Sequence, residues 1–180
     1  MRRIQALALT VATVVATTIF GTGQPALAAD PPGYSDCVGE RVHPKATGEL
    51  LAGGNNYTDW APNADIYDND AFKIRAEGSI TIDWWGNRVD VAGVSALAPT
   101  GWPLAGERQY MLIAKVNTGR VFLQHRSRWY YANQWFPVGA NSGCLWYDGT
   151  SRGTYFTFSY NDITLNDNGG NARVVVQQWW

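Results

Sequence analysis

The sequence predicts an all-β protein that folds as a single antiparallel β-sandwich of the jelly-roll type. Short runs of residues alternate between apolar and polar side chains, which is the pattern of a strand with one buried face. Glycine and proline residues are spread along the chain and separate several of these runs. No stretch shows a convincing helical repeat of apolar residues. Several short strands without intervening helices are typical of sandwiches and jelly rolls.

The first segment, residues 1–29, has the features of a secretory signal peptide. Arg2 and Arg3 precede a long uncharged and mostly apolar stretch, and the small residues of Ala26-Leu27-Ala28 provide a cleavage pattern. A membrane anchor is the alternative, but Gln5 and several threonines interrupt the apolar stretch. We therefore expect a secreted protein that has no membrane contact once the signal peptide is removed.

Residues 30–45 are expected to form an extended N-terminal lead, followed by the sandwich domain over residues 46–180. The two cysteines of the chain are Cys37 in the lead and Cys144 in the domain. In an exported protein a disulfide bond between them is the natural expectation, and closing a loop of this length stabilises a fold by about 4–5 kcal/mol in the chain-entropy model. The alternative makes Cys144 a nucleophile with His125, but neither cysteine lies in a recognisable catalytic sequence.

The strand pattern is clearest near the C-terminus, where Phe156, Phe158 and Tyr160 fall on one face of a single run. Upstream, residues 71–75 and 79–83 are expected to form two strands, separated by a turn at Glu77-Gly78. The remaining candidate strands are residues 110–116, 121–124 and 173–180.

The charge balance excludes a basic nucleic-acid-binding protein. Removing Arg2 and Arg3 with the signal peptide leaves 12 of the 14 Lys and Arg residues against 15 Asp and Glu residues, a net charge of −3. No run of Lys or Arg provides a local basic patch. Nucleic acid is therefore not an expected partner.

The stretch "YNDITLNDNGGN" (residues 160–171) carries far more Asn and Asp residues than a hairpin turn needs. Calcium prefers six to eight oxygen ligands from carboxylates, amides and backbone carbonyls. Asp162, Asp167 and Asn168 offer such oxygens from both ends of one loop, and Gly169-Gly170 lets the chain fold back. A polar loop without metal is the alternative, because Asn and Asp are also common turn residues.

The segment "YFTFSYNDITLNDNGGNARVVV" (residues 155–176) resembles the C-terminal signature of LecA-type calcium-dependent galactophilic lectins and, more loosely, galactose-binding-like β-sandwich domains. Asp162, Thr164, Asp167 and Asn168 match the order of the family's metal-binding residues. The segment "IRAEGSITID" (residues 74–83) is similar to a strand–turn–strand of that family and places Arg75 where a backbone carbonyl binds the metal. The resemblance implies a Ca²⁺ cofactor held by these five residues.

The chain has nine tryptophans and nine tyrosines, a composition that suits carbohydrate binding because the C–H face of a sugar packs on an aromatic ring. The expected mechanism is binding without catalysis. Calcium coordinates two vicinal hydroxyls, the ligands hydrogen-bond the same hydroxyls, and an aromatic side chain takes the apolar face. The carbohydrate-binding residues expected are Asp162, Thr164, Asp167, Asn168 and Trp102. The expected partner is a glycan or small sugar, and self-association is compatible with this function.

Two other functions remain open from the sequence. A secreted glycoside hydrolase needs a pair of carboxylates, and Asp83, Asp90 and Glu107 are available. A structural or inhibitory scaffold would use the sandwich for display and would carry at most a structural metal. Fold alone does not separate these functions.

Overall fold

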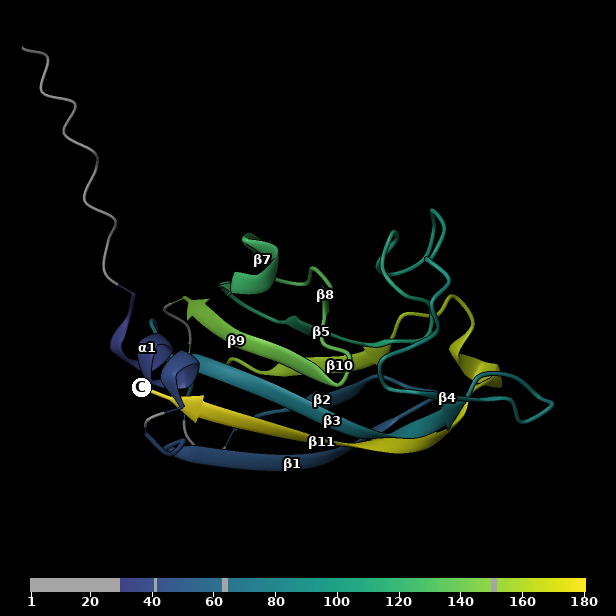
Figure 1. Ribbon diagram of the computed structural model, residues 1–180, viewed down its shortest axis with the longest axis horizontal. Helices are drawn as coiled ribbons and strands as arrows, with labels where there is room; N and C mark the ends of the chain where they lie inside the picture. The colour runs from purple at the N-terminus through teal and green to yellow at the C-terminus, as the bar shows by residue number, and fades with distance from the viewer. Residues whose placement is uncertain (1–29, 41, 63–64, 150–151) are drawn as a thin grey trace, which may run out of the picture.

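The computed structural model describes residues 30–40, 42–62, 65–149 and 152–180. Two antiparallel sheets face each other, as Figure 1 shows, and the prediction of an all-β sandwich is confirmed. The predicted signal peptide, residues 1–29, lies outside the described residues. Among the residues that are described, no helix is long and apolar enough to cross a lipid bilayer.

The larger sheet has seven strands in the order β1-β11-β3-β9-β6-β7, with β4 paired to β3, and the smaller sheet has the order β2-β10-β5-β8. The larger sheet is made of β1 (Ala46–Gly53), β3 (Ala71–Thr81), β4 (Arg88–Asp90), β6 (Arg120–Leu123), β7 (Arg128–Tyr131), β9 (Asn141–Asp148) and β11 (Gly169–Trp179). The smaller sheet is made of β2 (Thr58–Trp60), β5 (Leu112–Val116), β8 (Phe136–Pro137) and β10 (Phe156–Tyr160). One helix, α1 (Pro32–Gly39), and two short 3₁₀ segments, η1 (Gln124–Arg126) and η2 (Leu165–Asp167), complete the described elements.

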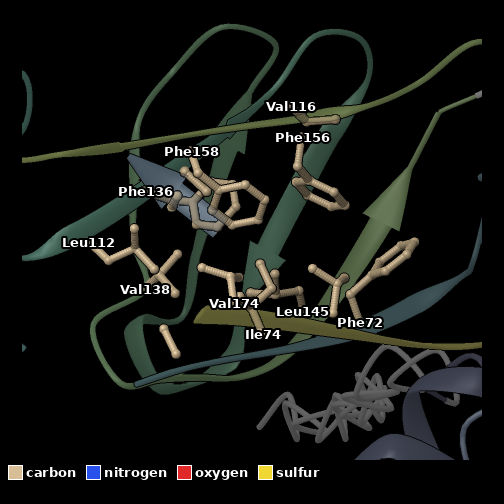
Figure 2. Packing of buried hydrophobic residues seen from close by; sticks show 14 of the residues in the cluster. Phe72, Ile74, Leu112, Val116, Phe136, Val138, Leu145, Phe156, Phe158 and Val174 are labelled. Carbon is tan, nitrogen blue, oxygen red and sulfur yellow. The ribbon is translucent and has the colours of Figure 1, made fainter. Parts of the chain in front are cut away.

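The hydrophobic core lies between the two sheets. Figure 2 shows Phe72, Ile74 and Val174 of the larger sheet gathered with Phe156 and Phe158 of the smaller one. All five side chains are fully buried. Fully burying a side chain of this size contributes about 1.5–3 kcal/mol, so the alternation read from β10 identifies a major part of the stabilising surface.

The outer face of the smaller sheet is also covered. Thr157 and Ser159, which point away from the core on β10, are buried, and so is Ile113 on the neighbouring strand β5. Loops outside the two sheets must therefore lie over this face. Lys115 alternates with Leu112, Ala114 and Val116 of the core and points to the same covered side.

Strand β3 is longer than the sequence predicts. The expected turn at Glu77-Gly78 is wrong, because β3 continues through both residues and pairs with β11 along its whole length. Gly78 has a φ of 112° and pairs with Ala172. A glycine accepts this backbone conformation inside a strand, and the neighbouring strand β11 keeps the chain extended on both sides of it.

The N-terminal lead contains a helix where an extended segment was expected. Helix α1 carries Cys37, which forms the predicted disulfide bond with Cys144 of β9, with Cα atoms 6.0 Å apart. Cys37, Tyr34 and Trp179 form a second buried cluster around this bond. The helix is explained by its tertiary contacts, because eight residues are too few for a stable isolated helix.

Candidate functional site

The oxygen-rich loop, residues 161–168, joins β10 to β11. Figure 1 shows it at the same end of the sandwich as the β3–β4 hairpin and the long teal segment that leads into β5. The strand register determines the position of this loop, because Gly169, which follows it, pairs with Thr81 at the end of β3. The ends of three strands, β1, β3 and β10, therefore surround the loop.

Glycines allow the backbones to approach closely here. Gly54, which follows β1, donates a hydrogen bond from its backbone N–H to Gly170 O at 3.0 Å. A Cβ atom at Gly54 would lie 2.6 Å from the carbonyl oxygen of Gly169, so only glycine fits. Gly170 has a φ of 73°, a left-handed conformation that glycine adopts without cost. The expected turn at Gly169-Gly170 is wrong, because both glycines are strand residues of β11 that pair with Thr81 and Ile80, and the chain reverses within residues 161–168 instead.

Two polar side chains of the loop, Asp162 and Asn168, are joined by a hydrogen bond. Asn168 donates from Nδ2 to Oδ2 of Asp162 at 2.9 Å and to the carbonyl oxygen of Gly54 at 3.3 Å. Asp162 also accepts a hydrogen bond at Oδ1 from the backbone N–H of Thr164, at 3.0 Å. Asp162 and Asn168 are each 6% exposed. The two ends of the loop are therefore joined by buried hydrogen bonds.

Two oxygens in the same loop have no hydrogen-bond donor. Asp167 Oδ1 and Asn168 Oδ1 are buried and unpaired. A buried acceptor without a partner costs about 1–3 kcal/mol, and more when it is charged. A cation satisfies such acceptors, and carboxylate and amide oxygens are the ligands that calcium prefers. The residues present therefore fit a hard divalent cation at this loop.

Only two of the possible metal donors in this loop are carboxylates, those of Asp162 and Asp167. No group of three His, Cys, Asp or Glu side chains suited to a metal occurs among the described residues. The loop instead offers the carboxylates of Asp162 and Asp167, the amide oxygen of Asn168 and the carbonyls of a short turn. Zinc sites draw on Cys and His ligands, whereas calcium sites combine these oxygens.

Tyr110 borders the loop in a strained conformation. Its backbone N–H donates to Asn161 O at 2.8 Å, and its φ is 62°, a region that bulky side chains rarely occupy. Burial, followed by the negative charges of Asp162, Asp167 and Asp83, raises the pKa of its phenol. Three carboxylates thus act on one hydroxyl. Strain of this kind is concentrated at functional sites, and the sequence pattern did not indicate Tyr110.

Trp102 is held at the edge of the site through Tyr110. The two rings make an edge-to-face contact, with centroids 5.5 Å apart and planes at 70°. Trp102 is half-buried, and its neighbours Gly101 and Pro103 line a cavity that reaches Asp162. The structure therefore brings Trp102 near the loop, although its ring faces Tyr110.

Arg75 does not belong to this group. It pairs with Val175 in the middle of β3, whereas the residue of β3 beside the loop is Thr81. Six residues of strand separate Arg75 from Thr81, which is about 20 Å at about 3.3 Å per residue. The Arg75 guanidinium instead lies 3.3 Å from Glu40. Its carbonyl therefore cannot complete a metal site with Asp162.

Asn161, immediately before Asp162, fixes the long segment that precedes β5. Its Oδ1 accepts from the backbone N–H of Leu104 at 2.9 Å, and its Nδ2 donates to the carbonyls of Leu104 and Arg108 at 2.9 and 3.0 Å. Asn161 is fully buried. The two residues after β10 thus have different roles. Asn161 holds the segment that precedes β5, whereas Asp162 accepts hydrogen bonds from Thr164 and Asn168 of its own loop.

A cavity of about 400 Å³ opens beside Asp162. Residues from four separate segments line it: Tyr57, Gly101, Pro103, Trp135, Asp162, Ile163 and Leu165. The rings of Tyr57 and Trp135 are stacked, with centroids 5.8 Å apart and planes at 23°. No local sequence pattern combines these two aromatic residues, because Trp135 lies 78 positions (135 less 57) after Tyr57.

The carboxylates considered for a hydrolase hold local structure instead. Asp83 and Asp90 each accept hydrogen bonds from backbone amides of their own turns, and Glu107 lies 2.7 Å from Arg126 in an ion pair. Cys144, considered as a nucleophile, is oxidised in the disulfide bond.

No protein-family model matches the chain. No curated protein matches it either. Among solved structures, one similar chain is described as "EclA N-terminal domain; PllA-like lectin", with 16% sequence identity and a TM-score of 0.42. The match covers 76% of this chain and 98% of that one.

Proposed function

We propose that this protein is a secreted, calcium-dependent carbohydrate-binding protein that recognises sugar hydroxyls at the 161–168 loop. The observation that carries the proposal is the pair of buried, donor-free oxygens on Asp167 and Asn168 beside the hydrogen-bonded Asp162. Buried acceptors of this kind are normally satisfied, and a cation bound between the two would satisfy both.

The residues that would hold the ion are Asp162, Asp167 and Asn168 through their side chains and Thr164 through its carbonyl. A bound calcium ion supplies open coordination positions, and two vicinal hydroxyls of a sugar suit them. The carboxylates of Asp162 and Asp167 accept hydrogen bonds from the same hydroxyls. Arg75, which lies far along β3, has no part in this proposal.

Binding also needs a surface for the apolar side of the sugar. Trp102 packs against Tyr110 at the border of the loop. This contact restricts the rotamers of the Trp102 side chain before a ligand binds, which lowers the entropy cost of binding. Because the protein makes and breaks no bond in this scheme, we propose that it binds carbohydrate without catalysis.

Export is part of the proposal and is supported by the sequence of residues 1–29. The disulfide bond between Cys37 and Cys144 is compatible with it, because such bonds persist in oxidising compartments outside the cytosol.

The first test measures the metal. Thermal and denaturant unfolding of the mature chain are compared in calcium and in EDTA. Calcium at about 100 times its Kd adds about 2.7 kcal/mol to the free energy of unfolding. Asp167→Ala should lose this increment, because it removes one of the donor-free oxygens. An equal stability in calcium and EDTA would exclude the metal from the function.

The second test measures the sugar. A glycan array is probed with the wild-type protein in calcium and in EDTA, and then with Asp167→Ala in calcium. We expect retention only for the wild type in calcium. A protein that is stabilised by calcium but retains no glycan would instead be a scaffold with a structural metal. Turnover of chromogenic glycosides would identify a hydrolase.

A further inference from the structure

The stacked rings of Tyr57 and Trp135 lie outside the group of residues that the calcium site needs. Tyr57 is 61% exposed although it packs on another aromatic side chain. If the two rings only sealed the outer face of the smaller sheet, both would be expected to be covered. One ring face of this pair is therefore available to a ligand.

A lysine of the smaller sheet contacts both rings of the Tyr57–Trp135 pair. Lys115 of β5 lies over both rings, with its ammonium nitrogen 4.8 Å from the centroid of Trp135 and 5.9 Å from that of Tyr57. These distances are in the range of attractive cation–π contacts. Lys115 pairs with Thr157 of β10 in the middle of the smaller sheet. A side chain from a regular strand thus contacts both rings and supports their orientation.

The aromatic pair is continuous with the proposed calcium site. Tyr57 and Trp135 line the same cavity of about 400 Å³ as Asp162, with Pro103 and Ile163 also on its walls. Ile163 is 64% exposed and lies next to Asp162 in the chain. A ligand anchored at Asp162 can therefore extend along one cavity to the rings without leaving the protein surface.

We propose that Tyr57 and Trp135 form an additional sugar-binding subsite, which holds the sugar unit next to the one at the 161–168 loop. The preferred ligand is then a neutral oligosaccharide of at least two units. The C–H face of the second unit packs on the exposed Tyr57 ring, as apolar sugar faces do on aromatic side chains. This inference rests on the proposed function, because the first unit is placed by the calcium site.

The test compares a monosaccharide with an oligosaccharide. The wild-type protein is probed in calcium on an array of neutral mono- to tetrasaccharides. The Kd of the best-retained oligosaccharide, and of the methyl glycoside of its terminal sugar, is then measured by calorimetry. Tyr57→Ala should weaken oligosaccharide binding by about tenfold, which corresponds to about 1.4 kcal/mol, and leave the methyl glycoside within about twofold.

Two matched variants separate ring stacking from other effects. Tyr57→Phe keeps the ring and should bind like the wild type. Tyr67→Ala removes a similarly exposed tyrosine. Tyr67 lies just before Ala71, the end of β3 that is far from the 161–168 loop, so this variant should also leave binding unchanged. Both variants and Tyr57→Ala should retain the calcium-dependent increase in stability, which shows that the loop still binds metal.

The failures are distinguishable. If the wild type retains oligosaccharides and Tyr57→Ala weakens both ligands equally, or weakens neither, the subsite is excluded and the proposed function stands. If the wild type retains no glycan in calcium, the proposed function fails and the subsite fails with it.

Discussion

Asn168 Nδ2 lies 2.9 Å from Asp162 Oδ2 and closes the oxygen-rich loop from the inside. Because the amide nitrogen is used in this way, the amide oxygen of Asn168 is left facing away from that bond without a donor. One side chain thus stabilises the loop through its nitrogen and leaves its oxygen without a partner, in the place where we propose that a cation binds. This division predicts that the stability of the loop and its metal binding respond differently to substitution.

Asn168→Ala should destabilise the protein even in EDTA. The substitution removes the hydrogen bonds to Asp162 and to Gly54 O and leaves buried acceptors unpaired, at a cost of about 1–3 kcal/mol. Asp167→Ala is the control, because its buried Oδ1 has no partner, so the substitution breaks no hydrogen bond at that oxygen and should not destabilise the metal-free protein. The measurement is urea unfolding of the metal-free proteins. Equal destabilisation of both variants would contradict the assignment.

Gly54→Ala should weaken metal binding from outside the loop. The new Cβ would lie 2.6 Å from the carbonyl of Gly169, so the two backbones must separate and Gly54 O moves away from Asn168. We expect a loss of about 1–3 kcal/mol from overpacking and a smaller calcium-dependent rise in Tm. Gly48→Ala is the control, since its added Cβ would lie 2.6 Å from the Trp60 side chain and would overpack β1 away from the loop, so its calcium response should stay complete. A full calcium response in Gly54→Ala would show that the approach of β1 is unimportant to the site.

Removal of the disulfide bond should cost about 4–5 kcal/mol in the chain-entropy model, because the bond closes a loop across a sequence separation of 107 residues. The measurement is guanidinium unfolding of the oxidised wild type and of the Cys37→Ser, Cys144→Ser double variant. The proposed calcium site lies at the other end of β3 from Ala71, which packs beside this bond, so the calcium response of any folded double variant should persist. A cost below about 1 kcal/mol would mean that helix α1 docks without the bond.

The contribution of Asp70 to the free energy of unfolding should decrease as pH rises above the ordinary pKa of an aspartate. It is 2% exposed, and burial raises its pKa in the folded state despite hydrogen bonds from Tyr67 N and Gln178 Nε2. A raised folded-state pKa means that the folded protein binds the proton more tightly. The contribution of Asp70 is therefore fully present below about pH 3.9 and is lost as pH rises through the folded pKa.

Asp70→Asn tests this sign directly, because the amide oxygen still accepts both hydrogen bonds. Relative to the wild type, the variant should gain stability between pH 3.5 and pH 7, as measured by urea unfolding at several pH values. A difference between Asp70→Asn and the wild type that is constant across this range would contradict the prediction.

The loop that the sequence singles out is the one that the structure closes around buried oxygens. Asp162, Asp167 and Asn168 are close in the chain, so their composition alone predicts that they share a turn. Thr164 is part of the same turn for the same reason. The disulfide bond was equally predictable, because the chain offers only one pair of cysteines.

The prediction that Arg75 belongs to the metal site is wrong, because the similarity of a short segment to a family motif does not determine the register of its strand. Sequence reading divided residues 71–83 at Glu77-Gly78, whereas pairing with β11 keeps β3 continuous and carries Arg75 about 20 Å from the loop. Which residue of a long strand meets a given loop depends on hydrogen bonds to its neighbours.

The sequence by itself determined the alternation of β10, the pairing of Cys37 with Cys144 and the oxygen donors of a single turn, since each depends on residues near one another or on a unique pair. Only the tertiary structure decided that Tyr110 borders that turn and that Tyr57 stacks on Trp135. These contacts join distant segments, and the packing of two sheets and their loops, which no local pattern encodes, brings them together.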